Sequence, residues 1–258
     1  MFISRDDAQL YTVAFGDGPR ALLALGGWIG SWELWAGPFG YLSRTWRTVA
    51  YDHRGAGATI APPESISPET LVDDVFAVLD ELEIARCVLA AESAGAAVAL
   101  LAALRQPQRF GGLVIVDGRY YEAAPHEPSP FLSGLRASYQ ATLDQFAAAC
   151  VPEPGGAPIR RWGRQILARA EQPAAIRLYE CMREVDLRPR AHEIVPPTLI
   201  LHGEADVIVP MTDARWLAER IPNSRLVVLP GAGHVPTMTR PREVAAAIDE
   251  FFAPERRD

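Results

Sequence analysis

The chain of 258 residues contains no lysine, so arginine supplies all of its basic side chains other than histidine. Acidic residues are in excess, with 32 against 25 basic ones and a net charge of -7. This balance argues against nucleic acid or an anionic membrane as a partner. The chain also lacks any apolar run approaching the ~20 residues that a membrane span needs. We therefore expect no nucleic-acid partner and no membrane span.

Cysteine is scarce, and Cys87, Cys150 and Cys181 stand at unrelated spacings. An odd number of scattered cysteines argues against a disulfide framework, and the histidines have no ligand-like spacing. We predict no metal and no cofactor, and a reducing cytoplasm is the expected location. Residues 1–7 carry Arg and Asp without an apolar stretch, so we also expect no secretory signal peptide.

Apolar strand-like runs alternate with helix-like segments in the first and last parts of the chain. The expected strands are 10–15, 21–25, 46–51, 86–91, 112–117, 197–202 and 225–229. The expected helices are 68–83, 94–105, 212–220 and 242–252. This order predicts an α/β fold, with a mostly parallel central sheet flanked by helices on both faces. In such sheets ligands lie beyond the carboxyl ends of the strands.

The alternation stops at residues 120–194, a stretch too long for an ordinary connection. Several prolines open it, and helical periodicity follows at 131–150, 158–170 and 174–184. We predict two parts of the chain: a core built from 1–119 and 195–258, and a helical lid inserted at 120–194.

Ser93 lies where a strand-like run meets an alanine-rich, helix-like run. Small residues, Ala91 and Gly95, stand two positions to either side. A strand that turns this abruptly into a helix tolerates only small side chains there, and it strains the residue at the apex. This is the pattern of a nucleophile elbow, Gly-x-Ser-x-Gly, with Ala91 in place of the first glycine. On its own, the pattern also fits a serine that only caps a helix.

Further motifs follow the expected strands. They are Gly26-Gly27-Trp28, Asp52-His53-Arg54-Gly55-Ala56-Gly57, Gly203-Glu204-Ala205-Asp206-Val207-Ile208-Val209-Pro210 and Gly231-Ala232-Gly233-His234. Together with the elbow, in this order, they resemble the α/β-hydrolase superfamily over nearly all of the chain outside 120–194. Relatives usually carry His-Gly where this chain has Gly26-Gly27, and that histidine supports the loop. How the loop is supported here stays open.

The resemblance implies a serine hydrolase, whose nucleophile, acid and histidine follow in this chain order as Ser93, Asp206 and His234. His234 would act as the base that a serine hydroxyl needs, and Asp206 would fix the imidazole tautomer. Asp117 also follows an apolar strand, where some relatives carry the acid, and it is the alternative to Asp206. The backbone N–H groups of Trp28 and Ala94 would form the oxyanion hole.

The predicted substrate is a small, apolar, ester-type molecule, and the reaction is cleavage of a carboxylic ester or lactone through an acyl-enzyme. We expect substrate contacts at Gly27, Trp28, Tyr120, Phe131 and Trp162. We also expect more than half of the aromatic residues in 120–194 to pack the lid onto the core instead.

Other functions stay open. The same triad also serves hydrolases of C–C bonds and acyltransferases, and some superfamily members bind a ligand for signalling. Epoxide hydrolases and dehalogenases are disfavoured, since they place Asp where this chain has Ser93. Two charged neighbours receive blander interpretations: Arg54 as a structural residue, and Glu92 as a solvated or hydrogen-bonded carboxylate.

Overall fold

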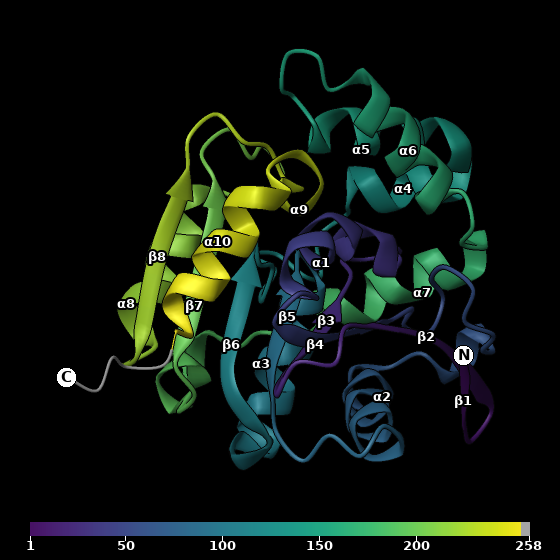
Figure 1. The fold of residues 1–258 in the computed structure, drawn as a ribbon. Coiled ribbons are helices and arrows are strands. Elements are labelled where there is room, and N and C mark those ends of the chain that lie inside the picture. The colour runs from purple at the N-terminus through teal and green to yellow at the C-terminus, as the bar shows by residue number, and fades with distance from the viewer. Residues whose placement is uncertain (254–258) are drawn as a thin grey trace.

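Eight strands form one sheet in a computed structural model that describes residues 1–253 (Figure 1). The strands are β1 Phe2–Arg5, β2 Ala8–Phe15, β3 Arg20–Leu25, β4 Trp46–Tyr51, β5 Cys87–Glu92, β6 Phe110–Val116, β7 Thr198–Gly203 and β8 Ser224–Leu229. Their order across the sheet is β1-β2-β4-β3-β5-β6-β7-β8. β2 pairs antiparallel with β1 and β4, and the remaining pairs are parallel. The predicted mostly parallel sheet is confirmed.

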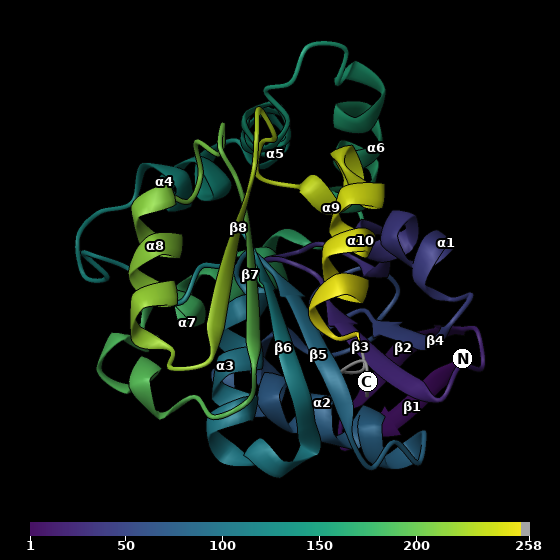
Figure 2. The same cartoon turned by 60° about the vertical axis from the view of Figure 1, so that its left-hand side comes forward.

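Helices cover both faces of the sheet, because alternate residues of its central strands point in opposite directions. Leu23 and Leu89 join the core that packs against α2 (Pro68–Glu81), α3 (Gly95–Arg105) and α8 (Met211–Arg220). Leu22 and Val88 join the second core, under α1 (Ala36–Leu42) and α10 (Pro241–Phe251). Figure 2 shows α1 and α10 on one side of the sheet and α3 and α8 on the other. Such strands, buried on both faces, explain the continuous apolar runs of the sequence.

The start of α2 follows its predicted signal. Ser67 accepts a hydrogen bond from the N–H of Thr70, and Pro68 occupies the first turn. The helix ends at Glu81, two residues before the expected end, because Glu83 takes a left-handed conformation with a φ of 54°.

Sequence patterns missed the elements whose composition disfavours them. α1 contains two glycines and a proline in seven residues, so its helix propensity is poor. β1 is a four-residue edge strand, and the four-residue helix α9 (Pro236–Thr239) is equally short. Propensity carries little information over such lengths.

Four helices lie between β6 and β7. They are α4 Pro130–Ala137, α5 Tyr139–Cys150, α6 Ala157–Leu167 and α7 Gln172–Arg183, and the short 3-10 helix η4 Arg188–Glu193 follows them. The single helical stretch expected at 131–150 is wrong in one respect. Non-helical backbone at Ser138 (φ −151°, ψ 64°) divides it into α4 and α5. α4, α5 and α6 lie beyond the carboxyl ends of the parallel strands (Figure 1).

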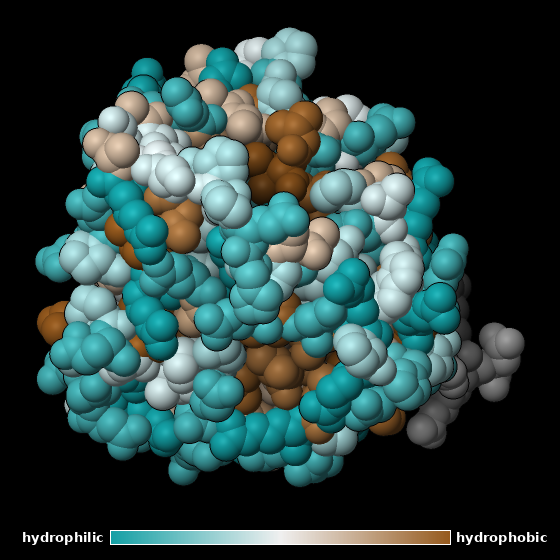
Figure 3. Space-filling model, turned by 180° about the vertical axis from the view of Figure 1, so that it is seen from behind, coloured by the Kyte–Doolittle hydropathy of each residue, from teal (hydrophilic) through white to brown (hydrophobic). Residues whose placement is uncertain are grey.

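The face in Figure 3 is mostly hydrophilic, with small apolar patches. Within residues 1–253, none of the helices combines the length and the apolar character that crossing a bilayer requires.

Candidate active site

Ser93 occupies a sharp turn between β5 and α3. Its φ is 52°, a left-handed value that is uncommon for residues other than glycine, so the predicted strain at the apex is confirmed. Its N–H donates to the carbonyl of Val116 at 2.9 Å. A Cβ at Gly95 would lie 2.4 Å from the carbonyl oxygen of Gly26, which is too close for any side chain. One at Gly27 would lie 2.9 Å from the Cβ of Ser93, so these glycines let two loops meet at the serine.

The folded chain brings Ser93, His234 and Asp206 into one line of hydrogen bonds. Ser93 Oγ lies 2.9 Å from His234 Nε2, and His234 Nδ1 lies 2.8 Å from Asp206 Oδ2. A carboxylate can only accept, so Nδ1 carries the proton and Nε2 is left to accept the serine hydroxyl. The backbone N–H groups of Ile208 and Val209 donate to Asp206 Oδ1 at 2.7 and 3.1 Å.

Asp206 is held in its charged form. Burial acts to raise its pKa, but the hydrogen bond and charge of His234 outweigh that effect, and the two backbone N–H groups add to them. The net result is a pKa below the ordinary value for Asp. A negative charge is therefore maintained beside the imidazole ring.

The loop of His234 is fastened to the connection between α5 and α6. The N–H of His234 donates to the carbonyl of Cys150 at 2.9 Å, and the N–H of Gly233 donates to Glu153 Oε1 at 2.9 Å. The Glu153 side chain is buried. Sequence reasoning missed both contacts, since neither Cys150 nor Glu153 belongs to a motif.

Asp117, the alternative acid, lies nearby but bonds elsewhere. Its Oδ1 accepts the N–H of Gly203 at 2.8 Å, and His202 Nδ1 lies 3.3 Å from the same oxygen. Burial and the charge of Asp206 raise the pKa of Asp117 well above its ordinary value, which favours the uncharged acid. Of the two carboxyl groups, Asp206 is the one bonded to the His234 ring in this structure.

Asp117, Asp206 and His234 each offer a ligand atom within 4.8 Å of the others. This is the one such group of three or more found among residues 1–253. Nδ1 and Nε2 of His234 are already committed to Asp206 and Ser93, and two N–H groups donate to Asp206. The donor set therefore suits proton transfer better than metal binding.

The Gly-Gly-Trp loop, residues 26–28, passes directly over Ser93. Neither Trp28 nor Ala94 uses its backbone N–H in a hydrogen bond to any group in residues 1–253. His53 supports this loop, since its Nε2 lies 3.0 Å from the carbonyl oxygen of Gly27. A histidine from the loop after β4 thus contacts the segment where relatives carry their own.

The side chain of Trp28 ties this loop to the helices between β6 and β7. Its indole N–H donates to the carbonyl of Ala175 at 2.9 Å. Its ring meets Phe131, Phe146 and Tyr179 edge-on, with centroids 5.0, 5.5 and 6.4 Å away. The aromatic contacts favour one placement of Trp28 relative to α4, α5 and α7.

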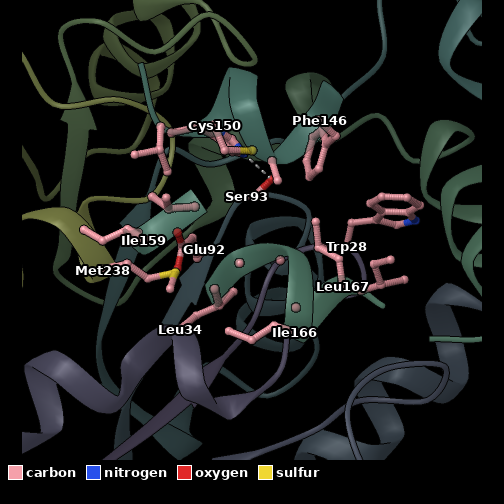
Figure 4. Close-up of a pocket in the computed structure, with 18 of the residues that line it drawn as sticks. Trp28, Leu34, Glu92, Ser93, Phe146, Cys150, Ile159, Ile166, Leu167 and Met238 are labelled. Carbon is pink, nitrogen blue, oxygen red and sulfur yellow. Dashed lines mark hydrogen bonds between the residues drawn. The ribbon is translucent and has the colours of Figure 1, made fainter. Parts of the chain in front are cut away.

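An apolar cavity opens beside Ser93 (Figure 4). Its space is about 550 Å³, including the part open to solvent. Its apolar wall includes Leu34, Phe146, Ile159, Ile166, Leu167 and Met238. A second hollow also reaches Trp28 and Ser93, and its lining includes Phe131, Tyr179, Arg119 and Arg183.

The predicted substrate contacts divide into two groups. Gly27, Trp28 and Phe131 lie on the walls of these hollows. Tyr120 does not: it is 1% exposed, and its hydroxyl donates to the carbonyl of Asp213 beneath a stacked Trp216, so it is a core residue.

Trp162 is likewise placed away from Ser93. Its side chain is 37% exposed, and α6 turns Ile159, Gly163 and Ile166 toward the cavity instead. The prediction that Trp162 and Tyr120 line the site is therefore wrong. Aromatic composition alone does not reveal which face of a helix points inward.

The two charged neighbours differ from each other. Arg54 is buried, and its Nε pairs with Asp74 at 2.8 Å, so the structural interpretation fits. Glu92 is 0% exposed, so the solvated interpretation is wrong, although a hydrogen bond from Thr237 is present. Burial raises the pKa of Glu92 to about 8, and the negative charge of Asp206 adds to this effect. At neutral pH it is therefore largely uncharged.

The chain is similar to known hydrolases in sequence and in structure. The model of the alpha/beta hydrolase family matches residues 21–247. The pimeloyl-[acyl-carrier protein] methyl ester esterase of Nitrosomonas europaea is 28% identical over 255 residues, covering 94% of this chain and 99% of that protein. The putative carbamate hydrolase RutD of Caulobacter sp. is 29% identical, covering 88% of each. A hydrolase structure from Pseudomonas aeruginosa superposes with a TM-score of 0.88 and 25% identity, covering 98% of both chains.

Proposed function

The chain belongs to the alpha/beta hydrolase family, and from that premise we propose that it hydrolyses a carboxylic ester or lactone through an acyl-enzyme on Ser93. The observation that carries the proposal is the 2.9 Å contact between Ser93 Oγ and His234 Nε2, with Asp206 behind the ring. Similarity to an esterase that acts on a methyl ester supports an ester as the bond that is cleaved.

In the first half of the reaction, Ser93 Oγ attacks the carbonyl carbon while its proton passes to His234 Nε2. Asp206 stabilises the imidazolium that forms, and it holds the ring in the tautomer that can accept. The imidazolium then returns the proton to the departing alcohol oxygen, and the acyl group remains on Ser93. In the second half, His234 takes a proton from water, whose oxygen attacks the acyl carbon. The imidazolium then returns that proton to Ser93 Oγ as the acid is released, which restores the hydroxyl and the neutral ring.

The negative oxygen of the tetrahedral intermediate would be bound by the backbone N–H groups of Trp28 and Ala94. Both flank Ser93, and both are uncommitted among the described residues. Each donor of this kind is worth about 3 kcal/mol in the transition state. Because they belong to the main chain, the position of residues 26–28 matters more than side-chain identity.

Residues 120–194 would act as the lid over this site. α5 and α6 supply Phe146, Ile159 and Ile166 to the apolar cavity, so the segment would select the substrate by its shape and exclude water. The contact of Cys150 with His234 would make the position of this segment matter for the base as well.

Hydrolysis of p-nitrophenyl esters of increasing acyl length tests the proposal. We expect turnover of short acyl chains and at least a 10³-fold lower kcat in Ser93→Ala, since the remaining groups cannot form the acyl-enzyme. Ser133→Ala, an exposed serine on α4, is the matched control and should retain full activity. Absence of turnover across all chain lengths, or equal activity in Ser93→Ala, would contradict the proposal.

A further inference from the structure

Glu92 is the last residue of β5 and directly precedes Ser93. Its Oε2 accepts the hydroxyl of Thr237 at 2.7 Å, whereas Oε1 is buried without a hydrogen-bond partner in residues 1–253. No Arg or His side chain within that range forms an ion pair with it. A carboxylate without a cation is costly in such surroundings, so the group is expected to hold its proton.

Glu92 is one of the residues that line the apolar cavity beside Ser93, and its Oε1 is buried there. Figure 4 places it beside Met238, at the edge of the space enclosed with Ile159 and Ile166. Met238 is flexible by nature and can move to admit a ligand atom. The most buried polar group of this wall therefore lies next to the nucleophile, among hydrocarbon side chains.

A carboxylic acid has one O–H donor. Thr237 already donates to Oε2, so the proton belongs on Oε1, the oxygen that lacks a partner. A plain alkyl chain in the cavity would leave this donor without an acceptor. An anionic group would lose its hydration there, at a large cost in free energy, and would be repelled by the charge of Asp206. A neutral oxygen atom satisfies the donor without either penalty.

We propose that Glu92 determines substrate specificity by donating a hydrogen bond from Oε1 to a neutral keto, ether or ester oxygen of the substrate. The preferred substrates are therefore esters whose arm in this cavity carries such an oxygen a few atoms from the scissile bond. This inference rests on the proposed function, since it assigns the substrate class of the same site.

The test uses matched substrates that differ by one oxygen. For the acyl arm the pairs are p-nitrophenyl pentanoate against 4-oxopentanoate and against 3-methoxypropanoate. For the alcohol arm the pair is butyl acetate against 2-methoxyethyl acetate, followed by pH titration of the released acid. The readout is the ratio of kcat/KM for the oxygen-bearing ester to kcat/KM for the alkyl ester, which cancels effects common to both substrates.

We expect the wild-type ratio to be at least tenfold in one arm, because a site that donates to substrate discriminates against analogues that lack the acceptor. Glu92→Leu should bring the ratio to about one, and Glu92→Gln, which keeps an N–H donor, should preserve it. A ratio near one in the wild-type protein for both arms, or a tenfold ratio that survives in Glu92→Leu, would overturn the inference.

A pH series in the wild-type protein and Glu92→Gln needs no disruptive substitution. The wild-type ratio should fall above about pH 8, where Glu92 ionises, and the Glu92→Gln ratio should stay constant. The charged and titratable groups around the carboxyl are Asp206, Asp117, Cys150, His234 and Arg160. Their titration affects both substrates and both proteins, so it cancels. A ratio that falls identically in both proteins would contradict the assignment.

Failure of this inference is distinguishable from failure of the proposed function. If the alkyl esters are hydrolysed and a fluorophosphonate labels Ser93, but the ratios are flat, only the role of Glu92 is wrong. If no ester is hydrolysed and Ser93 is not labelled, the hydrolase proposal fails and the inference fails with it.

Discussion

Replacing Glu92 with Gln should change how the stability of the protein depends on pH. The Glu92 side chain is 0% exposed. In Glu92→Gln the amide oxygen can take the place of Oε2 and accept the hydrogen bond from Thr237, so the substitution removes ionisation with little change of shape. In the wild-type protein, unfolding releases this carboxyl group into water, where it ionises at any pH above its ordinary pKa. Folding must then recapture a proton.

The magnitude follows from the pKa, which rises from an ordinary value of 4.5 to about 8 on folding. The folded state binds the proton more tightly, so below pH 4.5 this group does not lower the free energy of unfolding. Between the two values the cost grows by 1.36 kcal/mol for each pH unit, and it is constant above pH 8. From pH 5 to pH 9 the wild-type protein should lose about 4 kcal/mol relative to Glu92→Gln, a large part of the stability of a typical domain.

The assay is urea unfolding of both proteins at a series of pH values, with the difference in unfolding free energy plotted against pH. Titration of other groups cancels in this difference. Glu64→Gln, a substitution of an exposed glutamate, serves as the control and should give a flat difference. A flat difference for Glu92→Gln as well, or one that favours the wild-type protein as pH rises, would refute the idea that Glu92 is buried as a neutral acid.

Three further predictions concern the triad and its support. Asp206→Asn should lower kcat by about 10³–10⁴-fold, because the His234 ring loses its carboxylate partner. Asp117→Asn can still accept the N–H of Gly203, so its kcat should fall less than tenfold. Steady-state kinetics with one p-nitrophenyl ester measure both values, and the reverse order would show that the acid is wrongly assigned. His53→Leu removes the ring that contacts the loop at residues 26–28, so kcat/KM should fall about tenfold with KM little changed, and an unchanged kcat would dismiss this support. Gly95→Ala places a methyl group against a carbonyl oxygen at 2.4 Å, so thermal unfolding should show a loss of about 2 kcal/mol or more, and wild-type stability would contradict the crowded elbow.

The sheet and the elbow could be predicted because each is written in short-range patterns. Continuous apolar runs identify strands that are buried on both faces, and Ala91 and Gly95 around Ser93 identify the tight turn between β5 and α3. Motif order then indicated which later residues belong with Ser93. The short distances to His234 could not be read from the sequence, since they depend on how β7 and β8 place their loops.

Contacts between distant segments were not predictable. Nothing in the sequence near Cys150 indicates that its carbonyl would hold the loop of His234, because any residue has a carbonyl group. The aromatic residues of 120–194 all fitted an apolar roof, yet Phe131 reaches the site while Tyr120 and Trp162 do not. Their placement depends on how the helices rotate against the core, which residue type does not encode.

For Glu92 only the hydrogen-bonded interpretation holds, and the solvated one is wrong for a related reason. A glutamate at the end of an apolar run is usually solvated, and single-sequence reasoning had no sign that α9 would bring Thr237 over it. Its position inside a strand buried on both faces was the available signal, and it pointed toward burial.

The central claim is that His234 activates Ser93 as a nucleophile. The most direct measurement is the rate of labelling by a fluorophosphonate probe, with the modified residue mapped by mass spectrometry in the wild-type protein and in His234→Ala. We predict modification of Ser93 alone, and loss of labelling when the imidazole is removed. Modification at another residue, or equal labelling of Ser93 without His234, would contradict the claim.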